Sequence, residues 1–97
     1  MKTLINKVAL VTSATRGIGF ASALKLAQEG AIVYLGVRRM EDTQEICDRY
    51  TELKMIPVYF DAYKEETYKS MIDTIIEKEG RLDILVNNFG TSNPAKD

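Results

Sequence analysis

Residues 8–19 read Val-Ala-Leu-Val-Thr-Ser-Ala-Thr-Arg-Gly-Ile-Gly, and they carry the strongest structural signal in the chain. The run Val8–Thr12 is typical of a β-strand that is buried on both faces. Small residues follow, and Gly17 opens a stretch with helical spacing. A helix that begins here directs unpaired N–H groups and the positive end of its dipole toward an anion. The stretch therefore predicts a strand, a phosphate-binding loop and a helix, with an ordinary tight turn as the alternative.

The remainder of the chain continues this alternation of β-prone runs with helical stretches. The expected elements are strands at 8–12, 31–37, 55–60 and 82–87 and helices at 17–29, 41–53 and 64–79. Gly30 and Gly80 are expected to end the first and third helices. Such alternation predicts a parallel sheet with right-handed crossovers and helices on both faces. We therefore predict an α/β fold, with residues 1–97 forming the N-terminal β-α-β-α-β-α-β part of one Rossmann-type doubly wound domain, strand order 3-2-1-4.

Length and composition exclude several classes of function. The 97 residues suit one small domain, and a formal net charge of −1 provides no bulk attraction to nucleic acid or to an anionic membrane. No apolar run reaches the roughly 18 residues of a membrane span, and the N-terminus lacks the features of a signal peptide. The chain has no histidine, and Cys47 is its one cysteine. We expect a cytoplasmic protein with no metal site, because one thiol alone holds neither a disulfide nor a metal.

The loop after the first strand resembles the Thr-Gly-x-x-x-Gly-Ile-Gly signature of the short-chain dehydrogenase/reductase family. Ser13 replaces the first glycine of that signature. Serine lacks the freedom of glycine at positive φ, so the turn either keeps φ negative or carries strain. The loop residues expected to bind a dinucleotide are Ser13, Thr15, Arg16, Gly17, Ile18 and Gly19.

Two more motifs strengthen the resemblance, which runs from about Lys7 to Gly90. Asn87-Asn88-Phe89-Gly90 is similar to the family's Asn-Asn-Ala-Gly, which supports the central sheet and lines the adenosine ribose. Asp61 matches an aspartate that accepts a hydrogen bond from the adenine amino group, with the backbone of Ala62 nearby. Asp61 is equally plausible as the N-cap of the third helix. The resemblance thus implies cofactor contacts at Asp61, Ala62, Asn88, Phe89 and Gly90.

The end of the second strand indicates which nicotinamide cofactor is preferred. NAD-binding sites carry an acidic residue about 20 residues past the glycine loop, where it bonds the ribose 2′-hydroxyl. Val37 occupies that position, and Arg38 and Arg39 follow it. Arg38 is suited to bind a 2′-phosphate through paired, charge-assisted hydrogen bonds. We predict NADP(H) as the cofactor; the alternative is a solvated basic turn that pairs with Glu41 and Asp42.

The family's catalytic serine, tyrosine and lysine normally lie beyond the fourth strand, so no catalytic residue is assigned here. Tyr50 and Lys54 match Tyr-x-x-x-Lys by spacing alone. Tyr50 shares an apolar stripe with Ile46 and Leu53, which favours a core or boundary role. We expect the 97 residues by themselves to be inactive, and a product of this length to be unstable because its fourth strand would be an unpaired edge.

The resemblance implies an NADP(H)-dependent oxidoreductase that interconverts a secondary alcohol and a ketone. Within the family the motifs are similar to those of bacterial 7α-hydroxysteroid dehydrogenases, which act on bile acids, and also to 3-oxoacyl carrier-protein reductases. A non-catalytic nucleotide-binding half-domain is the alternative from another class, and a flavodoxin-like domain is a weaker one. Relatives of full length imply a homo-oligomer, commonly a tetramer.

Overall fold

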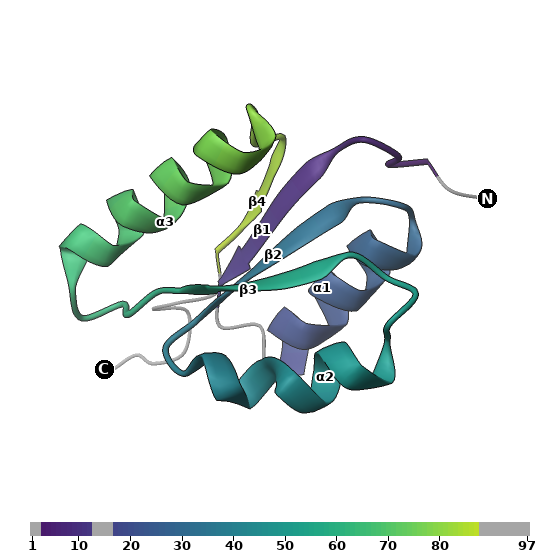
Figure 1. Ribbon diagram of the computed structural model, residues 1–97, viewed down its shortest axis with the longest axis horizontal. Coiled ribbons are helices and arrows are strands. Elements are labelled where there is room, and N and C mark those ends of the chain that lie inside the picture. The colour runs from purple at the N-terminus through teal and green to yellow at the C-terminus, as the bar shows by residue number, and fades with distance from the viewer. Residues whose placement is uncertain (1–2, 13–16, 88–97) are drawn as a thin grey trace.

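The computed structural model describes residues 3–12 and 17–87, and in Figure 1 helices flank a central sheet on both sides. The side chains of residues 17 and 18 lie outside this description. The elements in chain order are β1 (Val8–Thr12), α1 (Gly17–Gln28), β2 (Ile32–Val37), the 3-10 helix η1 (Met40–Thr43), α2 (Gln44–Arg49), β3 (Met55–Tyr59), α3 (Glu65–Glu79) and β4 (Ile84–Val86).

The four strands form one parallel sheet with the order β3-β2-β1-β4. This order confirms the predicted doubly wound topology. β1 lies between β2 and β4, with Leu10 opposite Tyr34 on one side and Leu85 on the other. The chain reverses its winding direction between β1 and β4, so the carboxyl ends of these two strands define the place where such folds bind ligands.

Two apolar cores lie on opposite faces of the sheet, because successive side chains of a strand point to opposite faces. Ala9 and Val11 of β1 belong to the core beneath α1 and α2. Val8 and Leu10 belong to the core beneath α3. Figure 1 shows α1 and α2 on one side of the sheet and α3 on the other. The five residues of β1 are all buried, as the apolar run predicts.

Pro57 in β3 is tolerated because its nitrogen faces away from the neighbouring strand. Lys54 O accepts from Val33 N, and Phe60 N donates to Val37 O, so the even-numbered residues of this segment bond to β2. Pro57 therefore falls on the outer side, where its missing N–H breaks no bond of the ladder. In the part of the chain that the structure describes, β3 pairs only with β2.

The helix stops predicted at the two glycines are confirmed. Gly30 has φ +103°, and its N–H donates to Ala27 O at the end of α1. Gly80 has φ +80° and caps α3 by donating to Ile76 O. These left-handed conformations suit glycine because it has no Cβ.

The predicted single helix over 41–53 is wrong. Its first residues form η1, and α2 covers only six residues and ends at Arg49. The chain must return to an extended path early, because Lys54 O already accepts from Val33 N of the sheet. Ile46, Tyr50 and Leu53 nevertheless all pack as half-buried residues on the core beneath α1 and α2.

Smaller differences concern α3 and β4. α3 buries Met71 and Ile75 against the sheet, whereas Ile76 lies beside this buried face and is 43% exposed. β4 is three residues long rather than six, and Leu85 is 45% exposed on the sheet face that α3 covers elsewhere. Within the described residues β4 pairs only with β1.

Candidate nucleotide-binding site

The carboxyl ends of β1 and β4 are joined by side chains. Thr12 follows the last register pair of the two strands, Val11 and Val86, and its Oγ1 lies 3.1 Å from Asn87 Oδ1 as a hydrogen-bond donor. Thr12 is completely buried. The bond fixes the side chain of Asn87 against the end of β1. Asn87 therefore contacts the central sheet, in agreement with the supporting role that the resemblance implies for the segment it begins.

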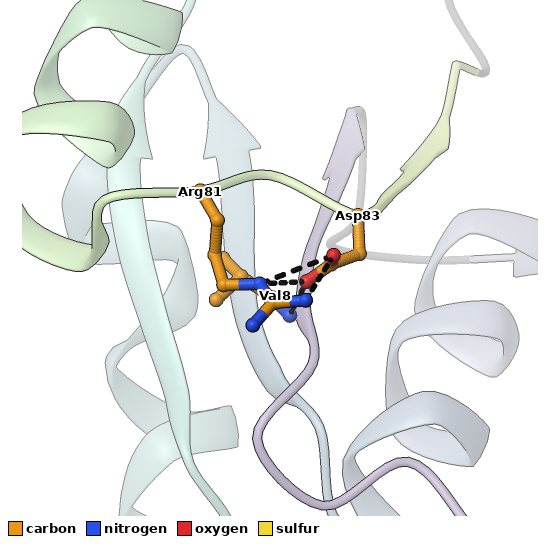
Figure 2. Close-up of polar contacts among 3 residues, drawn as sticks. All are labelled: Val8, Arg81 and Asp83. Carbon is orange, nitrogen blue, oxygen red and sulfur yellow. Dashed lines mark hydrogen bonds and ion pairs between the residues drawn. The ribbon is translucent and has the colours of Figure 1, made fainter.

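The amino ends of the same strands are joined by a second contact, which we call the Asp83 clamp (Arg81, Asp83 and Val8; Figure 2). Asp83 N donates to Val8 O at 2.8 Å, and Asp83 Oδ2 accepts from Val8 N at 2.9 Å. Arg81 donates through Nε and Nη2 to both carboxylate oxygens, with distances between 2.8 and 3.1 Å. A three-residue strand is thus tied to β1 by side chains at both of its ends.

The guanidinium of Arg81 and the N–H of Val8 together lower the pKa of Asp83, with Arg81 as the larger cause. The carboxylate is therefore held in its charged form, in which it accepts both sets of hydrogen bonds. Sequence reasoning missed this clamp. The available signal was a carboxylate between Leu82 and Ile84 at the entry to an apolar strand.

The end of β2 places the residues expected to read the ribose. Val37 is 4% exposed and packs in the core, so no carboxylate stands at the position where NAD-binding sites have one. Arg38 follows with an exposed side chain and has no ion pair among the described residues. Arg39 is also exposed, but its Nε lies 3.4 Å from Glu41 Oε2 and 3.7 Å from Asp42 Oδ1. The two arginines therefore differ in environment.

The end of β3 positions Asp61 through a network with the start of α3. Asp61 N donates to Thr67 Oγ1 at 3.0 Å, and Asp61 O accepts from Lys64 N at 2.9 Å. Asp61 Oδ1 accepts from Tyr63 N at 2.9 Å. The N-cap alternative for Asp61 is wrong: the helix begins at Glu65, and Lys64 is its N-cap with an extended backbone. The Asp61 side chain closes the turn that precedes the helix.

This network engages only part of the Asp61 carboxylate. Its residue is buried to 9% exposure, and Oδ2 has no hydrogen-bond partner in the described ranges 3–12 and 17–87. Ala62 is exposed beside it and borders a hollow of about 240 Å³. The hollow is lined by Phe60, Ala62, Lys64, Glu65 and Tyr68. Sequence reasoning did not identify the hollow, although its lining residues all lie between residues 60 and 68, because the way the turn folds back onto the first turns of α3 is not visible in the sequence.

Several predicted contact residues fall outside the described part of the chain. These are Ser13, Thr15 and Arg16 in the loop and Asn88, Phe89 and Gly90 after β4. Gly17 and Ile18 open α1, as predicted, and Gly19 is buried in its first turn. The structure brings Gly19, Arg38, Arg39, Asp61 and Ala62 to the elements that end or begin at the carboxyl edge of the sheet.

Tyr50 lies at the boundary of the core, which agrees with the core or boundary role predicted for it. Its ring centroid is 6.2 Å from that of Phe20, and it follows the last residue of α2. Lys54 lies beyond the turn at the start of β3, so these two residues are not on one helix face.

The described residues contain no group of three or more side chains that could hold a metal ion. None of the described helices is both long and apolar enough to cross a membrane.

The strand order and the crossover at β1 and β4 define a Rossmann-type α/β protein. Residues 7–97 match the family model for the short chain dehydrogenase. The chain therefore belongs to the short-chain dehydrogenase/reductase family, which confirms the resemblance seen in its motifs.

Within this family, the chain is similar to hydroxysteroid dehydrogenases and to a ketoreductase. The chain is 71% identical to a 7alpha-hydroxysteroid dehydrogenase of Paraclostridium sordellii, over all of this chain but 37% of that protein. The crystal structure of a hydroxysteroid dehydrogenase from Escherichia coli superposes with a TM-score of 0.83 at 30% identity, and covers 94% of this chain and 40% of its own. The crystal structure of the F189W actinorhodin polyketide ketoreductase with NADPH superposes with a TM-score of 0.78 at 31% identity. The match covers 91% of this chain and 34% of the ketoreductase. The chain thus spans little more than a third of its relatives.

Proposed function

We propose that the whole protein is an NADP(H)-dependent oxidoreductase that interconverts a secondary alcohol and a ketone, and that this chain supplies its cofactor-binding part. The observation that carries the proposal is the end of β2. Val37 is buried where a carboxylate would bond a ribose 2′-hydroxyl, and Arg38 next to it is exposed without an ion pair among the described residues. A 2′-phosphate meets no repelling carboxylate from residue 37 and has a guanidinium within the same turn.

The end of β3 supports an adenosine next to this arginine. Asp61 Oδ2 accepts no hydrogen bond in the described part of the chain, and the hydrogen bond from Asp61 N to Thr67 Oγ1 holds the residue in place. A carboxylate oxygen in this state suits an amino group as its donor. The residues proposed to hold the cofactor are Ser13, Thr15, Arg16, Gly17, Ile18, Gly19, Arg38, Arg39, Asp61, Ala62, Asn88, Phe89 and Gly90.

The bound nicotinamide cofactor would supply the hydride exchange with the substrate carbon. The part of the chemistry that this chain provides is binding and orientation of the cofactor, with the N-terminus of α1 at the carboxyl edge of the sheet. The proton transfer is proposed to come from residues beyond these 97, and we propose that the 97 residues alone do not turn over substrate.

For the substrate we propose a hydroxysteroid, because 71% identity links this chain to a 7alpha-hydroxysteroid dehydrogenase. A 3-oxoacyl thioester is the alternative substrate of the same reaction type. A homotetramer in the cytoplasm is proposed on the family resemblance.

The decisive experiment is a comparison of NADPH and NADH binding by the whole protein, followed through nicotinamide fluorescence. Arg38→Asp is expected to weaken NADPH binding by about tenfold to hundredfold, because it removes charge-assisted hydrogen bonds and adds a repelling charge. NADH binding should change much less. Arg49→Asp makes the same change of charge on α2, where Arg49 pairs with Glu45, and serves as the control.

If Arg38→Asp left the ratio of NADPH to NADH affinity unchanged, Arg38 would not be the residue that recognises the 2′-phosphate. Turnover of a 7α-hydroxysteroid with NADP⁺, compared with a 3-oxoacyl thioester with NADPH, then separates the two substrate classes. Cofactor binding with no turnover of either substrate would favour the non-catalytic half-domain.

A further inference from the structure

The two arginines after β2 are adjacent in sequence but are engaged differently. Arg39 Nε donates to Glu41 Oε2 and lies within ion-pair distance of Asp42 Oδ1, at 3.4 and 3.7 Å. Arg38 has no such partner among residues 3–12 and 17–87. Residues 38–42 thus contain two cations and two anions, and their charges cancel although the sequence reads Arg-Arg.

The position of the two carboxylates is set by the backbone of η1. Asp42 N donates to Arg39 O at 3.0 Å, which closes the turn that carries both acids. Thr43 is buried, and its Oγ1 donates to Met40 O at 2.7 Å, so the end of this turn is anchored in the core. Because the turn already holds Glu41 and Asp42 beside Arg39, little conformational entropy is lost when the ion pairs form.

We infer that Glu41 and Asp42 limit the cofactor specificity of the site by engaging Arg39 and offsetting its charge. This inference rests on the proposed preference for NADP(H). A 2′-phosphate near the end of β2 is attracted by Arg38, but both carboxylates repel it and Arg39 must leave its ion pairs to reach it. Glu41 and Asp42 are therefore positioning residues that act through Arg39, and Arg38 is the principal reader of the phosphate.

A local structural role is the competing explanation for the two acids. Both lie in the first turn of η1, where negative charge interacts favourably with the N-terminal end of the helix dipole. A role of that kind would change NADPH and NADH binding together, because it acts through the stability of the turn. A role in specificity changes NADPH binding selectively.

The test uses the whole protein and measures the dissociation constants of NADPH and NADH for Glu41→Gln/Asp42→Asn. We expect NADPH to bind about threefold to tenfold more tightly and NADH to change less than about twofold, since two negative charges near the phosphate are removed. The gain should shrink as salt is raised, because exposed charges are screened. Adding Arg39→Met should reduce the gain, because the part that comes from freeing Arg39 from its ion pairs is then lost.

Two further variants keep the inference falsifiable. Glu45→Gln/Asp48→Asn removes two exposed carboxylates from α2, where they contact Arg49 and Gln44, and should leave the NADPH to NADH ratio unchanged. Arg39→Met alone should weaken NADPH binding far less than Arg38→Met does, and this comparison does not need the turn variant to fold.

The outcomes separate this inference from the proposed function. If Arg38→Met lowers the preference for NADPH but Glu41→Gln/Asp42→Asn leaves it unchanged, the proposed function stands and the inference is wrong. An equal gain from the α2 control would attribute the effect to net charge and also overturn it. If the protein binds NADH as tightly as NADPH and Arg38→Met changes neither affinity, the proposed NADP(H) preference and the inference are both wrong.

Discussion

Asp83 and Val8 lie 75 residues apart in the chain, yet the side chain of Asp83 accepts a hydrogen bond from the backbone N–H of Val8 at 2.9 Å. The backbone N–H of Asp83 donates in return to Val8 O at 2.8 Å. Asp83, which directly precedes β4, therefore satisfies both the backbone N–H and the backbone carbonyl of Val8, the first residue of β1. Figure 2 shows Arg81 beside the same carboxylate. This clamp aligns the two strands whose other ends lead to the proposed cofactor site.

The clamp should make the stability of the protein sensitive to acid. Arg81, and to a smaller degree Val8 N–H, hold the pKa of Asp83 below its ordinary value. A carboxylate with a lowered folded-state pKa contributes stability above its unfolded pKa of about 3.9, and this contribution is lost as pH falls through the folded value. Asp83→Asn should therefore lower the urea midpoint at pH 7, and the difference from the wild type should shrink below about pH 4.

Asp73→Asn is the matched control for this prediction, because Asp73 is an exposed carboxylate that pairs with Lys69 on α3. Exposed pairs of this kind contribute little. A difference between wild type and Asp83→Asn that stays constant from pH 3 to pH 7 would show that the charge of Asp83 is not what the clamp uses.

Tyr34 is buried in the centre of β2, and its hydroxyl donates to Glu79 Oε2 at the end of α3 at 2.7 Å. Tyr34→Phe should destabilise the protein by about 1 kcal/mol, since it removes this hydrogen bond and leaves the packing intact. Burial, with the contact to Glu79, raises the pKa of Tyr34 to about 12. The stabilisation should be present below pH 10 and lost as pH rises toward 12.

A spectrophotometric titration near 295 nm measures this effect as the difference between wild type and Tyr34→Phe. The wild type should show one additional phenol that ionises about two pH units late. An additional phenol that ionises near pH 10 would contradict the buried contact.

Gly36 lies beneath α3, and a Cβ at this position would lie 2.9 Å from Met71 Sδ. Gly36→Ala should cost about 1–3 kcal/mol through overpacking. Met71→Ala alone should cost about 2–5 kcal/mol, because Met71 is buried. The double variant should lose less stability than the sum of the two single variants, because each change relieves the other. Urea unfolding of the wild type and the three variants measures these free energies. Strictly additive losses would exclude a direct contact between the two positions.

Asn6 has φ 72° in the turn in which Lys7 N donates to Leu4 O at 3.0 Å. A β-branched residue pays about 1–2 kcal/mol in this left-handed region. Asn6→Val should therefore lower the thermal midpoint clearly, whereas Asn6→Gly should be close to neutral. Equal destabilisation by both variants would point to the lost amide group rather than to the backbone.

Much of the architecture follows from the sequence alone. The buried run of β1, the alternation of elements and the helix stops at Gly30 and Gly80 are local signals, and together with the rule of right-handed crossovers they predict the strand order. The family assignment likewise depends on motifs that lie within short stretches of the chain. Val37 in place of an acid is visible in the sequence because the position is counted from the glycine loop.

The tertiary structure decided what depends on distant neighbours. The pairing of β2 with Lys54 ends α2 early, and the Thr67 network makes Asp61 the residue that closes a turn rather than an N-cap. The Asp83 clamp joins residues 75 positions apart, which no local pattern encodes. Even the sequence pair Arg38-Arg39 acquires two different environments only when η1 turns back, because the energy of a charge is set by what folding places within a few ångströms of it.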